Sequence, residues 1–179
     1  MNFDAVLNGA KAFAEGFIPL LVTALAVVAG LVIIYTAIAA LFRKGADGRS
    51  MQGANEPGYG SIAFRLLIGG AFLRFGATVE DISLLITGEA VQDYRGVLAY
   101  SPLPSAGAGA WMQVFEVCLL WLVMIGWAGA FKGLLLWNKA SNGGGGGGGA
   151  GDLFWQGTWH LIGGALAVNM AGAIKSFIG

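Results

Sequence analysis

The chain has few of the residues from which catalytic and metal sites are usually built. Its 179 residues include a single cysteine, Cys118, and a single histidine, His160. One cysteine excludes a disulfide within the chain, and one histidine leaves little basis for a metal cluster. The sequence also lacks a nucleophile elbow, a zinc motif and a dinucleotide-binding fingerprint. We therefore expect no enzymatic activity and no cofactor, and interpret Cys118 as a small apolar residue of a helix.

Charge is scarce as well, at 11% of the residues, with ten basic and ten acidic side chains. Soluble domains usually carry about 25% charged residues. Here 56% of the residues are hydrophobic and the mean hydropathy is +0.71. This composition predicts an all-α integral membrane protein, because a soluble fold of this length could not bury so much apolar surface. The formal net charge of zero argues against diffuse attraction to nucleic acid, and we expect no sequence-specific nucleic-acid binding.

One stretch, residues 107–138, predicts a single long membrane-spanning helix. Between Glu116 and Lys132 it carries no charge, and these 16 steps of an α-helix span about 24 Å. A bilayer's hydrocarbon core is roughly 30 Å thick, so both charges would lie close to its edges. Trp111 and Trp137 stand outside the two charges, where amphipathic rings favour the membrane–water interface.

The rest of the chain divides around this helix into a single helical membrane domain, 1–179, with about four hydrophobic helices. An N-terminal amphipathic helix, 1–15, is expected to lie at the membrane surface. Residues 16–42 carry no charge and predict the first span, which we interpret as a retained helix rather than a cleaved signal. The remaining segments are a basic loop (43–60), a short second span (61–75), an acidic outer region (76–106), the long third span (107–138), a poly-Gly linker (139–151) and a fourth span (152–179).

The sequence also predicts where two of the helices begin and what the glycine tract does. Thr78 followed by Glu80 and Asp81 has the pattern that caps a helix, and Asp152 can cap the last helix. The seven glycines at 143–149 are not followed by the Gly-Lys-Ser/Thr ending of a phosphate-binding loop, so they predict a flexible linker.

Basic residues set the expected orientation. Arg43 and Lys44 follow the first span, and positive residues beside a span tend to stay cytoplasmic, so both termini are expected outside. The segment 61–75 leaves two interpretations open. It either crosses the membrane with Arg65 and Arg74 near the margins, or lies along the interface.

Two sets of residues are candidates for function. Small residues at every fourth position predict close helix packing, and a polar thread in the last helix (Gln156, His160, Asn169) predicts hydrogen bonds between helices. Charges at membrane depth suggest pairing inside the bundle, such as Arg74 with Glu116, or the lining of a pore; the alternative is that they reach lipid headgroups. The packing candidates are Gly129, Gly133, Gly163, Ala167 and Ala171, and the charged candidates are Arg65, Arg74, Glu116 and Lys132.

Three strings carry a resemblance to a known family: RLLIGGAFLRFGATVEDIS (65–83), WAGAFKGLLLWNKA (127–140) and FWQGTWHLIGGALAVN (154–169). They resemble the TraQ-type membrane proteins of I-type conjugation systems, which are related to the Dot/Icm (type IVB) secretion machinery. Length and helix layout are similar across most of the chain. The strings are hydrophobic signatures and contain no catalytic motif, and neighbouring small membrane families of these systems are similar in build.

The resemblance implies a subunit of a type IV secretion apparatus that transfers plasmid DNA between bacteria. Its partners would be membrane lipid, copies of itself and other components of the apparatus, and a bound phospholipid is compatible with this role. Two roles stay open: a channel or scaffold in the bacterial inner membrane, or a pilin extracted into an extracellular pilus. A small membrane transporter or pore unrelated to conjugation is the alternative from a different class; it would need a binding site at the bilayer midplane.

Overall fold

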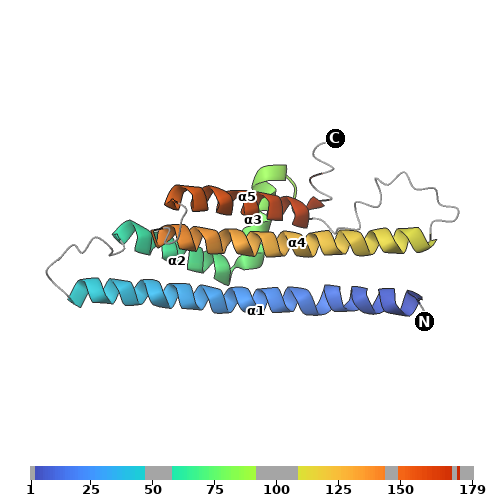
Figure 1. Ribbon diagram of the computed structural model, residues 1–179, viewed down its shortest axis with the longest axis horizontal. Coiled ribbons are helices and arrows are strands. Elements are labelled where there is room, and N and C mark those ends of the chain that lie inside the picture. The colour runs from blue at the N-terminus through green and yellow to red at the C-terminus, as the bar shows by residue number, and fades with distance from the viewer. Residues whose placement is uncertain (1–2, 47–57, 92–108, 144–148, 171–172, 174–179) are drawn as a thin grey trace.

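The computed structural model describes residues 3–46, 58–91, 109–143, 149–170 and 173, and within these ranges the regular structure is entirely helical. The helices pack side by side as an elongated bundle, and one of them lies across it (Figure 1). They are α1 (Phe3–Ala46), α2 (Tyr59–Leu73), α3 (Phe75–Thr87), α4 (Gly109–Ser141) and α5 (Ala150–Val168).

Helix α1 is longer than either of the two helices expected in its place. It is one α-helix of 44 residues that continues through Gly16 and Pro19, so an amphipathic helix 1–15 does not form as a separate element. Its apolar stretch long enough to cross a membrane is Leu20–Gly45. The physical reason is that Pro19 removes only one backbone hydrogen bond, whereas the long uncharged run that follows it favours unbroken helix.

Helices α2 and α3 form a bent pair in place of the expected short span and outer region. Their axes differ by 98°, with the break at Arg74, whose backbone has φ −108° and ψ 36°. The Thr78 hydroxyl donates a hydrogen bond of 3.0 Å to the Ala71 carbonyl across the break. Thr78 therefore lies inside α3 and does not cap it, contrary to the capping pattern in the sequence.

Aromatic side chains fill the inside of this bend. Phe72 is fully buried, and its ring meets the ring of Phe131 on α4 at 5.1 Å between centroids. Phe75, directly after the break, contacts Phe131 at 5.8 Å and Trp127 at 5.5 Å. The bend is therefore held against α4 by apolar packing, which is worth several kcal/mol for each buried aromatic side chain, roughly 3–5 on truncation to alanine.

Helices α4 and α5 form an antiparallel pair. Helix α4 is a single helix, which confirms the prediction of one long helix around Trp111–Trp137. It ends at Ser141, and two residues later Gly143 has a positive φ of 86°, which suits glycine, while the Gly143 amide donates to the Ala140 carbonyl. Helix α5 begins at Ala150 with Gly149 as its N-cap, so Asp152 lies in the first turn instead of capping the helix. Its negative charge still suits the positive end of the helix dipole.

Two helices are long and apolar enough to cross a membrane: Leu20–Gly45 of α1 and Val114–Ser141 of α4. A third crossing is present if the bent α2–α3 pair counts as one broken span. This count covers only the residues described, and α5 is not among the candidates. The expected boundary of the last span at 179 and residues 144–148 of the poly-Gly linker lie outside the described residues. The ends of the predicted linker 139–151 are helical, since 139–141 belong to α4 and 150–151 to α5.

Candidate functional site

The closest contact in the bundle is between the backbones of α4 and α5, and it depends on four glycines. A Cβ atom placed on Gly164 would lie 2.6 Å from the Ala130 nitrogen and 2.6 Å from the Gly126 carbonyl oxygen. At the other end of the contact, a Cβ on Gly133 would lie 2.7 Å from the Gly157 carbonyl oxygen. Real side chains do not approach backbone so closely, so only glycine fits at these positions.

The small residues proposed from sequence occupy this contact only in part. Gly133 is buried in it, and Ala167 lies opposite Gly126. Gly129 also faces α5, but a Cβ atom there would lie 3.6 Å from the His160 carbonyl oxygen, an ordinary van der Waals distance, so a larger residue would fit. Gly163 is exposed and would meet nothing within 4 Å. Ala171 lies outside the described residues.

A different spacing in the sequence marks the contact. Gly126 and Gly133 are seven residues apart on α4, and Gly157 and Gly164 are seven apart on α5. Seven residues are two turns of a helix, so each pair lies on one face, and the two faces meet in antiparallel order. The four-residue spacing used above missed this because small residues are common throughout the chain.

Helices α1 and α2 have one close contact of the same kind. A Cβ on Gly30 would lie 2.9 Å from the Gly69 carbonyl oxygen, and a Cβ on Gly69 would lie 2.5 Å from Cγ1 of Ile34. Gly69 thus faces a side chain, whereas Gly30 faces backbone. Toward the C-terminal end of α1, a basic pocket lies between the same two helices.

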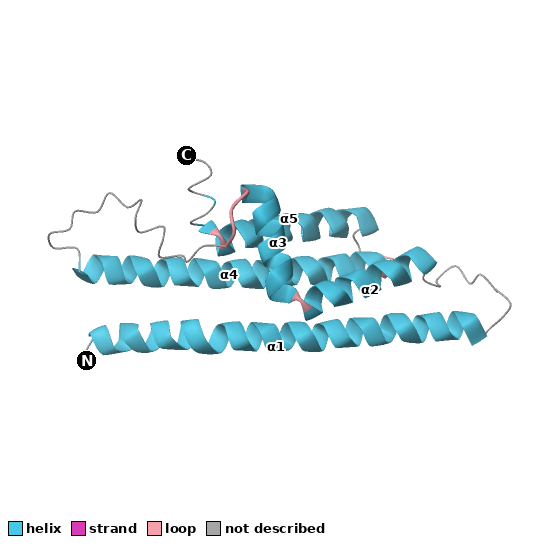
Figure 2. Ribbon diagram, turned by 180° about the vertical axis from the view of Figure 1, so that it is seen from behind, coloured by secondary structure: helices cyan, strands magenta, loops and turns pink. Residues whose placement is uncertain are grey.

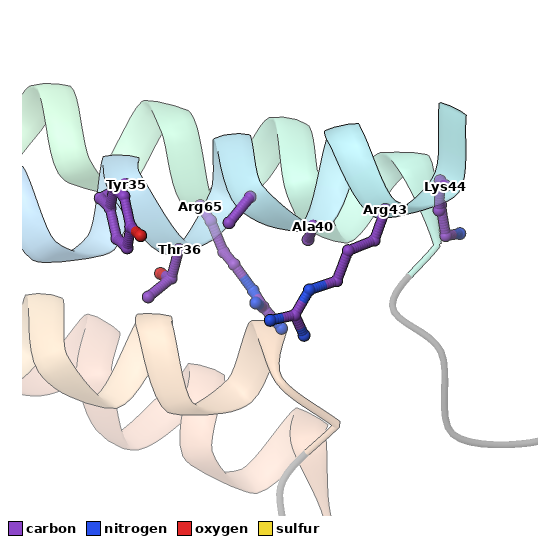
Figure 3. A pocket seen from close by; sticks show the side chains of 7 residues that line it. Tyr35, Thr36, Ala40, Arg43, Lys44 and Arg65 are labelled. Carbon is purple, nitrogen blue, oxygen red and sulfur yellow. The ribbon is translucent and has the colours of Figure 1, made fainter. Parts of the chain in front are cut away.

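The basic pocket lies between the last turns of α1 and the first half of α2 and has a volume of about 430 Å³. Its polar groups include three cations, and among the described lining residues there is no acidic side chain. Figure 3 shows the guanidinium groups of Arg43 and Arg65 pointing to the same place from the two helices. The pocket is lined by Tyr35, Thr36, Ala39, Ala40, Arg43, Lys44 and Arg65.

The three cations of the pocket differ in what they contact. Lys44 lies over the ring of Tyr59, with its Nζ 4.8 Å from the ring centroid, so its charge faces an aromatic surface. Within the described part of the chain, Arg43 and Arg65 have no carboxylate to neutralise them. The Nε atom of Arg65 is buried and makes no hydrogen bond to any described residue.

The other charged candidates are scattered. Arg74 is exposed at the α2–α3 break, and Lys132 is exposed on α4 outside the basic pocket. Glu116 is half-buried on α4, two residues inside the candidate span. Of the four charged residues proposed from the sequence, only Arg65 lines the basic pocket. Its charged neighbours there are Arg43 and Lys44, which the sequence analysis placed at the start of the basic loop. The pairing of Arg74 with Glu116 stays a prediction.

The polar residues of the last helix, Gln156, His160 and Asn169, make two kinds of contact, one within the helix and one to another segment. His160 Nδ1 lies 2.7 Å from the Gln156 carbonyl oxygen of its own helix, so it does not join helices through that atom. Asn169 is fully buried and does join them: its Nδ2 donates to the Glu89 carbonyl at 3.1 Å and to the Thr87 hydroxyl at 3.4 Å. This confirms the interhelical hydrogen bonding expected of Asn169 and ties the end of α3 to the end of α5.

Aromatic side chains gather at the same end of the bundle as the basic pocket. Trp137 of α4 stacks on Phe154 of α5 at 5.3 Å with an interplanar angle of 7°, and its Nε1 donates to the Phe154 carbonyl at 3.0 Å. Phe64 of α2 adds a third ring, 6.1 Å from Trp137. Trp155 and Trp159 are exposed nearby on α5. Rings of this kind are typical of the membrane–water interface.

Compared with known protein families, curated proteins and solved structures, the chain has no match. Among the described residues, no group of three or more histidine, cysteine, aspartate or glutamate side chains could hold a metal ion.

Proposed function

We propose that this chain is a non-catalytic, integral membrane subunit of a conjugative type IV secretion apparatus and that it assembles through close helix packing. The membrane part of the proposal rests on the surface of the two long helices. The conjugative part rests on the resemblance of the three sequence strings to TraQ-type proteins.

The observation that carries the membrane assignment is that α1 and α4 are apolar on the outside. In the apolar 18-residue stretch that makes each helix a candidate span, only 22% is buried inside the chain for α1 and 28% for α4. Most of the exposed side chains of α1 within its span are large and apolar, with Tyr35 73% and Phe42 75% exposed near the end. A surface of this kind needs lipid or other subunits to cover it.

The direction of the helices supports three or more crossings. The colours in Figure 1 show that α1 and α4 run the same way along the bundle. If both cross the membrane, the chain between them has to return across it, and the bent α2–α3 pair is the described helical element between them that is long and apolar enough to do so. We therefore favour crossing over an interfacial position for 61–75, as a span broken at Arg74.

The break favours a packed subunit over a transporter. Transporters use broken helices to present backbone and polar groups to a substrate at mid-membrane. Here the break is occupied by Phe72, Phe75 and Phe131, and the polar groups beside it, Thr78 and the Ala71 carbonyl, are bonded to each other. Arg74 is exposed at the break, but the described inside of the bend is filled by aromatic rings and by a polar pair that is already hydrogen-bonded.

The resemblance strings fall on the packed parts of the bundle. They include Ile68, Phe72 and Val79 of the bent pair, Ala130 and Leu134 of α4, and Leu161, Ala165 and Val168 of α5, all of which are buried in one core. These buried positions are compatible with a shared fold, which is what a structural subunit would keep, although the strings also include exposed residues such as Leu67, Arg74 and Trp155. Both roles, pilin and inner-membrane scaffold or channel, stay within the proposal.

The experiment is to delete the chain's gene in a donor strain and measure the frequency of plasmid transfer to a recipient. We expect a loss of transfer that the wild-type gene restores, and the chain in the inner-membrane fraction after alkaline washing. A fraction of sheared extracellular filaments is examined in parallel. The chain as their main subunit would select the pilin role, and its confinement to the inner membrane would select the scaffold or channel. Unchanged transfer after deletion would contradict the conjugative role.

A further inference from the structure

We propose that the basic pocket binds the phosphate of an acidic phospholipid headgroup from the leaflet at the C-terminal end of α1. The inference rests on the membrane placement proposed above and does not depend on the conjugative role. Arg43 and Arg65 hold the phosphate between them, and Lys44 lies at the edge of the site.

The electrostatics of the pocket call for an anion. Two guanidinium groups that converge without a carboxylate repel each other, and the repulsion grows as water is excluded from around them (Figure 3). A phosphate placed between them replaces this repulsion with charge-assisted hydrogen bonds. The Nε atom of Arg65 is buried without a hydrogen bond to the described residues, and the end of its guanidinium group points toward that of Arg43, where an anion would lie.

The shape of the pocket suits a headgroup. Ala39 and Ala40 keep the α1 side of the pocket open, and Arg65 reaches into this space from α2. The Thr36 hydroxyl donates to the Ile33 carbonyl of its own helix at 2.8 Å, which leaves its oxygen as an acceptor for a headgroup hydroxyl. A volume of about 430 Å³ is ample for a phosphate and a small polar group beside it.

The position of the pocket favours a lipid over a soluble phosphate. It lies at the last turns of the candidate span Leu20–Gly45, where a headgroup would be. The exposed side chains of α1 at this level, Ile38, Leu41 and Phe42, are apolar and can cover an acyl chain. Basic pockets between helices on the cytoplasmic side of a membrane are typical binding sites for acidic lipid headgroups.

The test measures how much phosphatidylglycerol the full-length chain retains. The chain is purified in mild detergent, reconstituted in nanodiscs of phosphatidylglycerol and phosphatidylcholine, re-extracted, and the lipid bound to it is counted by native mass spectrometry. The unaltered chain should retain phosphatidylglycerol in preference to phosphatidylcholine. Each lost charge-assisted contact should cost about tenfold in affinity, so the double variant Arg43→Gln/Arg65→Gln should lose nearly all retained phosphatidylglycerol.

Arg74→Gln is the matched control, because it removes one arginine that is exposed and lies outside the pocket. It should retain phosphatidylglycerol within about twofold of the unaltered chain, as expected for an exposed charge. Arg65→Lys keeps the charge and should retain an intermediate amount, since lysine lacks the bidentate geometry. Because Arg43 is exposed at a helix end, Arg43→Gln alone should leave folding intact and still weaken retention.

Three results would overturn the proposal. Equal losses in the Arg74→Gln and pocket variants would mean that retention reflects total charge. Equal retention of the two lipids by the unaltered chain would mean that no acidic headgroup is selected. Displacement of the lipid by excess inorganic phosphate would assign the pocket to a soluble anion. Failure of the membrane placement itself is distinguishable, because the chain would then leave the membrane fraction on alkaline washing.

Discussion

The α4–α5 pair and the bent α2–α3 pair show two different ways of holding helices together. In the first, backbone meets backbone across Gly126, Gly133, Gly157 and Gly164. In the second, side chains make the contacts that hold the helices: aromatic rings pack inside the bend, and Asn169 and Thr78 form hydrogen bonds. Figure 2 shows the consequence, since α5 lies along α4 whereas α3 crosses the bundle.

The difference predicts how each region responds to substitution. At a backbone contact no side chain can change its rotamer to make space, so one added methyl group has to displace a whole helix. A side-chain contact can rearrange rotamers at lower cost. The predictions below run from the region where we expect the largest effect to the one where we expect the smallest.

The largest effect is expected for Gly164→Ala. Its new methyl group would overlap the backbone of Ala130 and Gly126, so the substitution should destabilise the fold by about 3 kcal/mol, the upper end for overpacking. The neighbouring Gly163→Ala is the control, because nothing lies within 4 Å of its Cβ. It should leave stability unchanged or raise it by about 0.5–1 kcal/mol through helix propensity. Thermal unfolding in mild detergent measures both, and equal effects would contradict a backbone contact at Gly164.

A smaller effect is expected for Gly69→Ala, which lies on α2 of the bent pair where this helix contacts α1. Its methyl group would first meet the Ile34 side chain, which can turn away, and then the Gly30 carbonyl oxygen at 3.2 Å. The cost should be about 1–2 kcal/mol, less than that of Gly164→Ala. Gly70→Ala, with nothing within 4 Å of its Cβ, should be neutral in the same unfolding assay. A cost at Gly69 above that at Gly164 would reverse the comparison between the two regions.

Removing the hydrogen bonds of Asn169 should cost somewhat less. Asn169→Ala frees the end of α3 from the end of α5, while the Thr87 hydroxyl can still donate its one proton to the Ser83 carbonyl at 2.9 Å or the Glu89 carbonyl at 3.1 Å. The expected loss is about 1 kcal/mol. Hydrogen exchange should rise at α3 amides and stay unchanged along α4. Gln156→Ala, at an exposed position of α5, is the control and should alter neither quantity. Faster exchange along α4 in the Asn169→Ala variant would contradict a local role.

The smallest effect is expected at the break itself. Thr78→Val preserves shape and removes the hydrogen bond to the Ala71 carbonyl, at a cost of about 1 kcal/mol or less because Phe72 and Phe75 still hold the bend. Thr36→Val on α1 removes a hydroxyl bonded within its own helix and serves as the matched control. A loss of several kcal/mol in Thr78→Val would mean that the hydroxyl, and not the aromatic packing, sets the 98° bend.

The sequence predicts the long helices well because their signal is local. Absence of charge over a membrane-length run predicts α4 with its tryptophans and the apolar part of α1, and an isolated asparagine in an apolar helix predicts an interhelical bond. The break at Arg74 has no such local signal: the strong capping pattern begins at Thr78, four residues too late, and the bend depends on rings contributed by α4.

The sites are harder to predict for the same reason. Arg65 is conspicuous as a charge in an apolar helix, but its neighbours Arg43 and Lys44 come from a different helix and were interpreted only as orientation signals. The glycine contact was visible in principle, as two seven-residue spacings, yet 31 glycines supply many competing spacings. Only the partner helix decides which face of each helix is used.

The central claim is that α1 and α4 cross the membrane in the same direction, with the α2–α3 pair as the return crossing. The most direct measurement replaces Cys118 with serine and introduces single cysteines at three exposed positions: Gly45→Cys in the last turn of α1, Ala90→Cys after α3 and Asn142→Cys after α4. A membrane-impermeant maleimide is then added to spheroplasts. We predict labelling of Ala90→Cys in intact spheroplasts, and of Gly45→Cys and Asn142→Cys only after lysis. Labelling that puts all three positions on the same side of the membrane would contradict the account.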